Sequence, residues 1–360
     1  MNLAWGEDFD VLAEVSRSVF TRYSPLEDRS NHVAFADQVA QFAELGWLSL
    51  GDPTGMDADS ASLGTIAAVF VEMGRALAAT PLLELTLARD AALAAGTEES
   101  RELAEEIGSG SVAVIPVFPS ADWDSAVSYQ DGVLNGVALA IGYAGDADRF
   151  LVHAGGVESV LALVPAGPGI TVEEMPNMGG HPMFALTFDS ATVADPDVLA
   201  RGRIADDAVE IAESRCAVLR AAQVHGAGLR LLDMTVLYAQ QRHQFGGPIG
   251  RFQAVQYLCT DLAIAAHLTG VHARSTAEAV DAGVDPHPHV GLLRRQAAKA
   301  AQVMVHSAHE VHAGIGYMVE SNVHLFTNAA KRWQYDFGSQ ARNNGDVTSG
   351  LEQIYTGAVR

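Results

Sequence analysis

The spacing of apolar residues changes twice along the chain, and the order of these changes limits the fold more than any other feature. Over residues 7–107 apolar side chains recur every three or four positions, which is the spacing of a helix with one buried face. From about Ser111 short apolar runs separated by Gly and Pro replace this pattern, and after Arg203 the helical spacing returns. The sequence therefore predicts an α+β chain in which a helical part, a β part and a second helical part follow one another.

These three patterns define three expected domains. We expect an N-terminal helical domain (1–110), a middle β domain (111–202) and a C-terminal helical bundle domain (203–360). Within the first domain, the helical run over 61–95 should break at Thr80-Pro81, because proline ends one helix and can open the next.

The middle part predicts a set of short strands. Phe184, Leu186 and Phe188 alternate with other residues, as in a strand with one buried face. The continuous apolar runs predict further strands at Val112–Phe118, Val133–Ile141, Phe150–Val152, Val157–Val164 and Ile170–Val172. Turn-forming pairs predict chain reversals at Asp131-Gly132, Asn135-Gly136 and Gly155-Gly156.

The third part predicts long helices. One helix should extend from after Arg203 to Arg242, and others are expected over Phe252–Ala282, over Val290–His312 and from about Glu320. We expect His287 and His289 to lie in a Pro-rich loop between two of these helices.

Composition restricts the class of protein and its partners. The chain has 360 residues, with 44 acidic against 22 basic residues and a net charge of −22, so a surface that binds nucleic acid is not expected. Two cysteines do not form a disulfide framework, which fits a reducing cytoplasm. The first ten residues contain no Lys or Arg, and no apolar run reaches the roughly 18–20 residues of a membrane span. We therefore expect a cytoplasmic protein without targeting or membrane segments.

Three familiar kinds of site are weak or absent in the sequence. His306, His309 and His312 recur every third residue on one predicted helix, but no matching carboxylates accompany them, so packing histidines are expected and no metal. No Gly-x-Ser-x-Gly motif follows a strand, which disfavours a serine hydrolase. Gly314-Ile315-Gly316 follows a helix, so it does not match a dinucleotide-binding turn.

The strongest local feature is the segment Gln241–Gln253, in which a long helix ends in a Gly-rich turn and another helix begins. Arg242 offers a forked donor that suits a phosphate group, and Phe245 is an aromatic residue in the turn. On these residues alone, a plain helical hairpin with a cationic residue at a helix end remains an equal alternative.

The pattern Arg-x-Gln-Phe-Gly-x-Pro-Ile-x-x-Phe-Gln in this segment resembles the signature of the acyl-CoA dehydrogenase family. The resemblance spans the whole chain in order and implies that family's fold: an N-terminal helical domain, a middle β domain and a C-terminal four-helix bundle. A second segment, Glu310–Tyr317, resembles the Gln-x-x-Gly-Gly-x-Gly motif near the C-terminus of that family, with Glu310 in place of Gln and Ala313 in place of Gly. In such proteins FAD lies between subunits, and one subunit holds the pyrophosphate of a flavin that its neighbour mostly binds. The resemblance implies FAD contacts by Arg242, Gln244, Phe245, Ile249, Phe252, Gln253, Glu310 and Gly314.

The same resemblance raises the question of the catalytic base. Family members carry a Glu at one of two positions, which in this chain correspond to Phe337 and Cys216, and neither side chain is a carboxylate. Two nearby acids, Asp336 and Glu213, are the alternatives for a displaced base. The catalytic residues are therefore left unknown. The family's Thr-Glu-Pro and Gly-Ser-Asp segments, which line the flavin ring, also have no match around 117–124.

These departures resemble the heteromeric steroid side-chain acyl-CoA dehydrogenases of actinobacteria, in which one of two different subunits lacks the base. The resemblance implies an FAD-dependent oxidoreductase subunit with an acyl-CoA substrate, a second dehydrogenase-like subunit and an electron-transfer flavoprotein as acceptor. The alternatives are a self-sufficient homo-oligomer with a displaced base and a structural subunit that binds no flavin.

Overall fold

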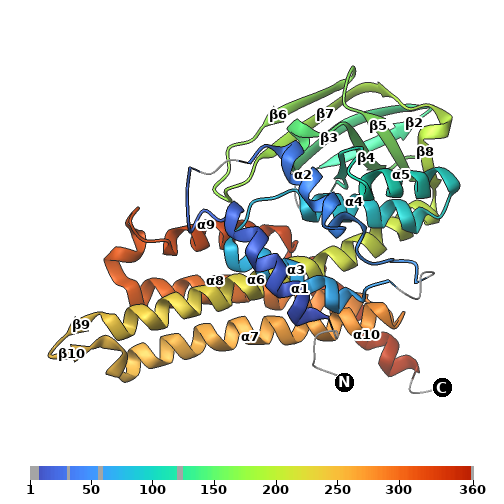
Figure 1. Cartoon of the computed structure of the whole chain (residues 1–360). Helices are drawn as coiled ribbons and strands as arrows, with labels where there is room; N and C mark the ends of the chain where they lie inside the picture. Colours follow the sequence, from blue (N-terminus) through green and yellow to red (C-terminus); the bar gives the residue numbers. More distant parts are fainter. Residues whose placement is uncertain (1–7, 31–32, 56–59, 120–124, 358–360) are drawn as a thin grey trace.

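The computed structural model describes residues 8–30, 33–55, 60–119 and 125–357. Two β-sheets lie on one side of a bundle of long helices (Figure 1). The N-terminal helices pack against the sheets and also against the bundle. The order of helical, β and helical parts is as the sequence predicts. The exact domain boundaries at 110 and 202 stay a prediction.

The N-terminal part is helical throughout its regular elements. These are α1 (Phe9–Phe20), η1 (Thr21–Tyr23), α2 (Phe35–Glu44), η2 (Trp47–Ser49), α3 (Leu63–Ala76), α4 (Leu82–Ala95) and α5 (Glu98–Gly108). The Ser62 hydroxyl caps α3 by accepting a hydrogen bond from the Thr65 amide, and Thr97 caps α5 in the same way. The expected break at Thr80-Pro81 separates α3 from α4, because Pro81 takes the N-cap position of α4.

The middle part consists of two four-stranded sheets with the orders β1-β4-β5-β8 and β2-β3-β7-β6. Their strands are β1 (Val114–Val117), β2 (Ala126–Gln130), β3 (Val133–Gly142), β4 (Arg149–Ala154), β5 (Val160–Pro165), β6 (Ile170–Glu174), β7 (Met183–Thr192) and β8 (Val198–Arg201). The short 3₁₀ turns η4 (Ala144–Asp146) and η5 (Asp195–Asp197) precede β4 and β8. Sequence periodicity did not identify β2 and β8, since β2 is mostly exposed and β8 has only four residues.

Two of the three expected chain reversals are present, and one is wrong. Asp131-Gly132 joins β2 to β3, and Gly155-Gly156 lies between β4 and β5. Asn135-Gly136 lies inside β3, where the pairing register shifts between Leu134 and Gly136. This is a β-bulge: Gly136 has φ 134°, and a Cβ there would lie 2.1 Å from the Ala126 carbonyl oxygen.

The C-terminal part contains five α-helices among the described residues, one more than a four-helix bundle, because the helical run expected from about Glu320 is divided at Phe337-Gly338. They are α6 (Arg203–Gln241), α7 (Gln253–Asp281), α8 (His287–His312), α9 (Val323–Asp336) and α10 (Gln340–Gly357). His287 and His289 lie in the first turn of α8, not in a loop as expected, because Pro288 fits a first helical turn, where its missing N–H is not needed. None of the helices in the described ranges combines the length and apolarity that a membrane span requires.

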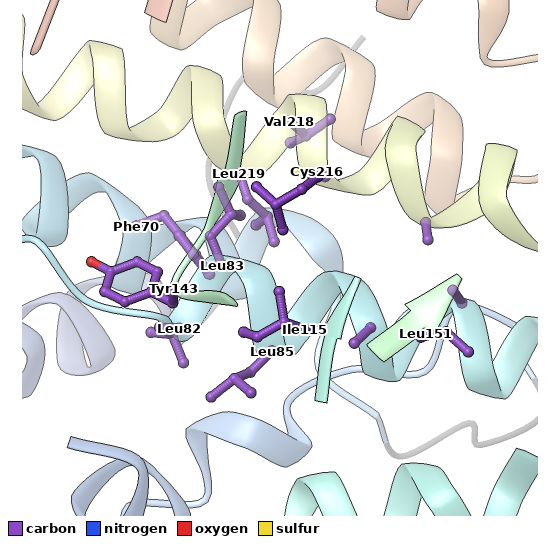
Figure 2. Packing of buried hydrophobic residues seen from close by; sticks show 14 of the residues in the cluster. Phe70, Leu82, Leu83, Leu85, Ile115, Tyr143, Leu151, Cys216, Val218 and Leu219 are labelled. Carbon is purple, nitrogen blue, oxygen red and sulfur yellow. The ribbon is translucent and has the colours of Figure 1, made fainter. Parts of the chain in front are cut away.

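The core joins the three parts around α6. Figure 2 shows buried side chains of α3, α4, β1 and α6, including Phe70, Leu85, Ile115 and Leu219, in one cluster. Helices α3 and α6 approach each other closely at two glycines: a Cβ at Gly74 or at Gly226 would lie about 2 Å from a carbonyl oxygen of the opposite helix. The core therefore fixes α6, and with it the hairpin at the end of α6, relative to the rest of the chain.

Candidate functional site: an exposed hairpin and a charged cavity

The Gly-rich turn predicted after the long helix is a short β-hairpin at the tip of α6 and α7 (Figure 1). Strand β9 (His243–Gln244) pairs with β10 (Gly247–Pro248), and η6 (Ile249–Arg251) leads into α7. Phe245 and Gly246 form the two-residue turn, with φ values of 52° and 86°. Two left-handed residues in succession are typical of the type I′ hairpin turn, although an aromatic residue is uncommon there.

The hairpin presents the predicted FAD contacts to solvent. Phe245 is 85% exposed, and its ring meets the ring of Phe252 edge-on at 6.0 Å. Arg242, Gln244 and Gln253 are exposed, whereas Ile249 and Phe252 are half-buried. The Arg242 guanidinium has no hydrogen-bond or ion-pair partner within the described ranges. The structure therefore brings together six of the predicted contacts, one of which is the unpaired forked donor of Arg242.

Sequence reasoning missed Arg251, an exposed side chain that contacts both the turn of the hairpin and Phe252. Its guanidinium donates a hydrogen bond to the Phe245 carbonyl and lies 4.9 Å from the centre of the Phe252 ring. It also lies over Gly247, where a Cβ would be 2.8 Å from its Nη1 atom. Two features of the sequence could have indicated this role. Arg251 directly precedes Phe252, and Gly247 leaves room for an arginine side chain that a larger residue would displace.

The second motif lies at the same end of the bundle. The Tyr238 ring of α6 stacks on the His312 ring of α8 with 4.3 Å between centroids, which joins the ends of the two helices. Gly314 follows in η7 (Ala313–Tyr317), and Glu310 and Gly314 are both exposed. The structure thus places all eight predicted FAD contacts toward one end of the helical bundle.

The neighbouring histidines pack rather than form a ligand cluster. His309 stacks on Tyr317 and contacts the Thr327 hydroxyl at 2.6 Å. Burial lowers the pKa of His312 to about 4, so its ring is neutral at physiological pH. No group of three potential metal ligands is found in the described part of the chain.

The two positions that match the family's base lie together at a different place. Cys216 of α6 and Phe337, directly after α9, both line a cavity of about 180 Å³ and are 6% and 1% exposed. Burial raises the pKa of the Cys216 thiol to about 11, so the thiol stays protonated. Neither residue can therefore remove a proton from a substrate near pH 7.

Both alternative acids line the same cavity, and both are ion-paired. Asp336 contacts Arg332 at 3.1 Å and Arg220 at 3.6 Å. Glu213 contacts Arg342 at 2.9 Å and lies 3.7 Å from Arg294. A proton taken up by either carboxylate would remove the negative charge that holds two guanidinium groups.

A charged network separates this cavity from a larger one of about 410 Å³, and sequence reasoning missed it. Glu84, Arg220, Arg332 and Asp336 line both cavities. Arg332 lies 3.7 Å from Glu84 as well as contacting Asp336. The i,i+4 spacing of Arg332 and Asp336 was visible in the sequence. The contacts of these two residues with Glu84 of α4 and Arg220 of α6 depend on tertiary packing.

The segment expected to lack the flavin-ring motifs is only partly described. Val117 ends β1, and Phe118 lines the smaller cavity. The rest of that segment, residues 120–124, lies outside the described residues, so the absence of these motifs stays a prediction.

Comparison with known proteins agrees with this fold. Residues 215–347 match the family described as acyl-CoA dehydrogenase, C-terminal domain. The chain is 28% identical to the acyl-CoA dehydrogenase FadE28 of Mycobacterium tuberculosis over 295 residues, which cover 79% of this chain and 84% of that protein. Residues 215–347 thus correspond to an acyl-CoA dehydrogenase C-terminal domain, and the similarities support an oxidoreductase that acts on acyl-CoA.

Two solved structures are similar over the whole chain. The ChsE4-ChsE5 complex from Mycobacterium tuberculosis contains a chain that is 25% identical, with a TM-score of 0.85 and 99% of both chains covered. The Tcur3481-Tcur3483 steroid ACAD has the same fold, at 23% identity and a TM-score of 0.84, with 99% of this chain and 100% of that chain covered. These similarities confirm the predicted acyl-CoA dehydrogenase fold.

Proposed function

We propose that this chain is a subunit of a hetero-oligomeric FAD-dependent acyl-CoA dehydrogenase, that it lacks a catalytic base, and that it supplies half of a flavin site to a partner subunit. The observation that carries the proposal is the state of the two base positions. A buried, protonated thiol and a buried phenyl ring occupy them in one cavity. The reaction needs a carboxylate that takes the proton α to the thioester, so the base would come from the partner.

The exposed hairpin fits half of an FAD site. A planar guanidinium without a partner suits a pyrophosphate, because its two parallel N–H groups match two phosphate oxygens. Phe245 presents an 85% exposed aromatic ring in the same turn, and such a ring can stack on a flat nucleotide. Both features therefore suit a flavin nucleotide that is held mainly by another chain.

In this arrangement the residues of this chain bind and orient the cofactor. Arg242 would hold the pyrophosphate, Gln244 and Gln253 would offer amide groups, and Phe245 would shield the nucleotide from water. Glu310 and Gly314, at the same end of the bundle, would make the second contact. When bound, FAD supplies the acceptor for the hydride that leaves the β carbon of the acyl group.

The similar structures support a partner of the same fold. ChsE4-ChsE5 is a complex of two components, and Tcur3481-Tcur3483 is a steroid ACAD. We accordingly infer a second acyl-CoA dehydrogenase-like subunit, an acyl-CoA of the steroid-degradation type bound mainly by that subunit, and an electron-transfer flavoprotein as acceptor. The expected location is the cytoplasm.

Co-expression tests the proposal directly. The chain is purified alone and together with an acyl-CoA dehydrogenase-like partner that carries a Glu at one of the two base positions. Flavin absorbance and acyl-CoA oxidation are then measured for both preparations. We expect flavin and turnover only in the pair. Turnover by the single chain that is abolished by Asp336→Asn or Glu213→Gln would establish a displaced base instead, and a pair whose flavin is independent of this chain's hairpin would indicate a structural subunit.

A further inference from the structure

The end of α6 and the end of α8 are joined by an aromatic contact, and one of the two predicted flavin motifs begins on each side of it. Helices α6 and α8 lie side by side in the bundle (Figure 1). Tyr238 lies in the last turn of α6, shortly before Arg242, and His312 is the last residue of α8, shortly before Gly314. The stack of the two rings, with 4.3 Å between centroids, therefore lies at the base of both motifs.

On the α6 side, the main chain of Tyr238 connects its ring to the hairpin. The Tyr238 carbonyl accepts a hydrogen bond of 2.8 Å from the Arg242 amide, at the C-cap of the helix. The Arg242 carbonyl in turn accepts a hydrogen bond of 2.8 Å from the Ile249 amide, which closes the base of the hairpin. The returning arm packs on the same turn, since a Cβ at Gly250 would lie 3.2 Å from the carbonyl oxygen of Ala239. A movement of Tyr238 therefore displaces both arms of the hairpin.

The ring of Tyr238 is the main side-chain support of this last turn. Gln240 and Gln241 are exposed, and Ala239 is buried but has only a methyl group. Tyr238 is half-buried and supplies the large side chain by which the turn contacts α8. Without that ring, the turn would be held mainly by main-chain hydrogen bonds, which open readily at helix ends.

On the α8 side, His312 is held by close packing of η7 against the helix. His312 is 6% exposed. A Cβ at Gly316 would lie 2.9 Å from His309 Nδ1 and 3.2 Å from His312 Cβ, so η7 folds back on the last turn of α8. The His309 ring stacks on Tyr317 of η7 at 4.2 Å, which joins the same two elements again. His312 is therefore a fixed support, against which Tyr238 can hold the end of α6.

We propose that Tyr238 is a positioning residue of the half flavin site, whose ring, stacked on His312, holds the hairpin that carries Arg242 at a fixed place relative to the Gly314 segment. The inference rests on the proposed flavin function. A bidentate contact requires two N–H groups to be aligned with two phosphate oxygens, so a loose helix end would weaken the contact although Arg242 itself is unchanged. Tyr238 acts through the hairpin and not by touching the cofactor.

Hydrogen exchange of the purified full chain tests this joint without any flavin. It is measured by mass spectrometry in peptides that span residues 239–250, which contain the amides of Arg242 and Ile249. Tyr238→Ala should speed their exchange about two- to tenfold, which corresponds to the contribution of an aromatic pair. Tyr238→Phe keeps the ring and should leave the exchange unchanged. Tyr129→Ala is the matched control, because Tyr129 is a half-buried tyrosine of β2 whose ring contacts Arg201.

Flavin retention by the co-expressed pair tests the effect on the site. Tyr238→Ala should speed the loss of flavin during dialysis about two- to tenfold, and Tyr238→Phe should retain flavin as the unchanged pair does. The double variant Tyr238→Ala/Arg242→Ala should lose flavin more slowly than the product of the two single effects requires, because Tyr238 acts largely through the arginine that is already absent. A residue that only stabilised the fold would multiply the effect of Arg242→Ala, so this comparison separates positioning from stability.

Variants of His312 identify the partner of the ring. His312→Phe keeps an aromatic ring at this place and should leave flavin retention unchanged. His312→Ala should speed exchange at the hairpin as Tyr238→Ala does. The two alanine changes combined should have about the same effect as either alone, because each of them removes the same contact.

Four results would overturn the proposal. Unchanged exchange at the hairpin in Tyr238→Ala would show that the ring does not hold it. Loss of flavin from Tyr238→Phe as fast as from Tyr238→Ala would assign the effect to the hydroxyl. Fully multiplicative effects of Tyr238→Ala and Arg242→Ala would show that Tyr238 acts independently of the hairpin. If Arg242→Ala retains its flavin while Tyr238→Ala still speeds exchange at the hairpin, the half flavin site is refuted and the joint has only a structural role, so the two failures give different results.

Discussion

The half-site proposal depends most on Arg242, and its replacement by Ala in the co-expressed pair gives the sharpest prediction. The side chain is exposed at the end of α6 and has no ion-pair partner within the described ranges, so its removal costs this chain little. Interaction with the helix dipole contributes roughly 0.3–1 kcal/mol. A bidentate contact with a pyrophosphate is worth on the order of 1.5–3 kcal/mol, which corresponds to a loss of flavin affinity of about 10- to 150-fold.

The assay is flavin retention by the pair during dialysis, followed by absorbance. Arg242→Lys should recover only part of the affinity, because lysine keeps the charge but loses the fork. Arg203→Ala is the matched control, since Arg203 is an exposed arginine at the opposite end of the same helix. If Arg242→Ala keeps full flavin occupancy and lowers only the melting temperature, the half-site assignment is wrong.

Three further predictions concern the hairpin and the core. Arg251→Gln should weaken flavin retention about two- to fivefold, because it removes a cation–π contact with Phe252 worth roughly 0.5–1 kcal/mol; an unchanged retention would show that Arg251 does not position the hairpin. Asp90→Ala removes the carboxylate that lies 2.7 Å from the buried Arg215 guanidinium. Urea denaturation should show a free energy of unfolding that is lower by about 3–5 kcal/mol. A loss below about 1 kcal/mol would contradict a buried ion pair. Burial lowers the pKa of His225 to about 4, so the unfolded state, with a His pKa of about 6.5, binds the proton first. His225 therefore contributes about 3 kcal/mol to the free energy of unfolding above pH ~6.5, and this contribution is lost as the pH falls toward ~4. His225→Asn should reduce the pH dependence of the denaturation midpoint over this range.

Much of the fold could be predicted because its signals are local. Helical and strand periodicities fall within short windows, and Thr80-Pro81 stops a helix through its own covalent geometry. The hairpin after α6 was also predictable, since a Gly-rich turn between two helical runs can adopt few conformations. The FAD contacts assigned there rest on a contiguous motif, so one segment of sequence holds most of them.

Tertiary structure decided what local signals could not. The Asn135-Gly136 pair has turn chemistry, but the close approach of β2 makes it a bulge within a strand. His287 has a proline on each side, yet it starts a helix because proline is compatible with a first turn.

The same division holds for the candidate sites. By itself, the sequence determined the order of helices and strands, the exposed motif and the loss of a carboxylate at positions 216 and 337. Only the tertiary structure showed that these two positions share a cavity and that Asp336 and Glu213 are already ion-paired there. Only the fold brings Glu84 of α4 to Arg332 of α9 and the Tyr238 ring of α6 to the His312 ring of α8. The physical reason is that residues far apart in sequence meet through the packing of whole elements, and no periodicity within one element encodes that meeting.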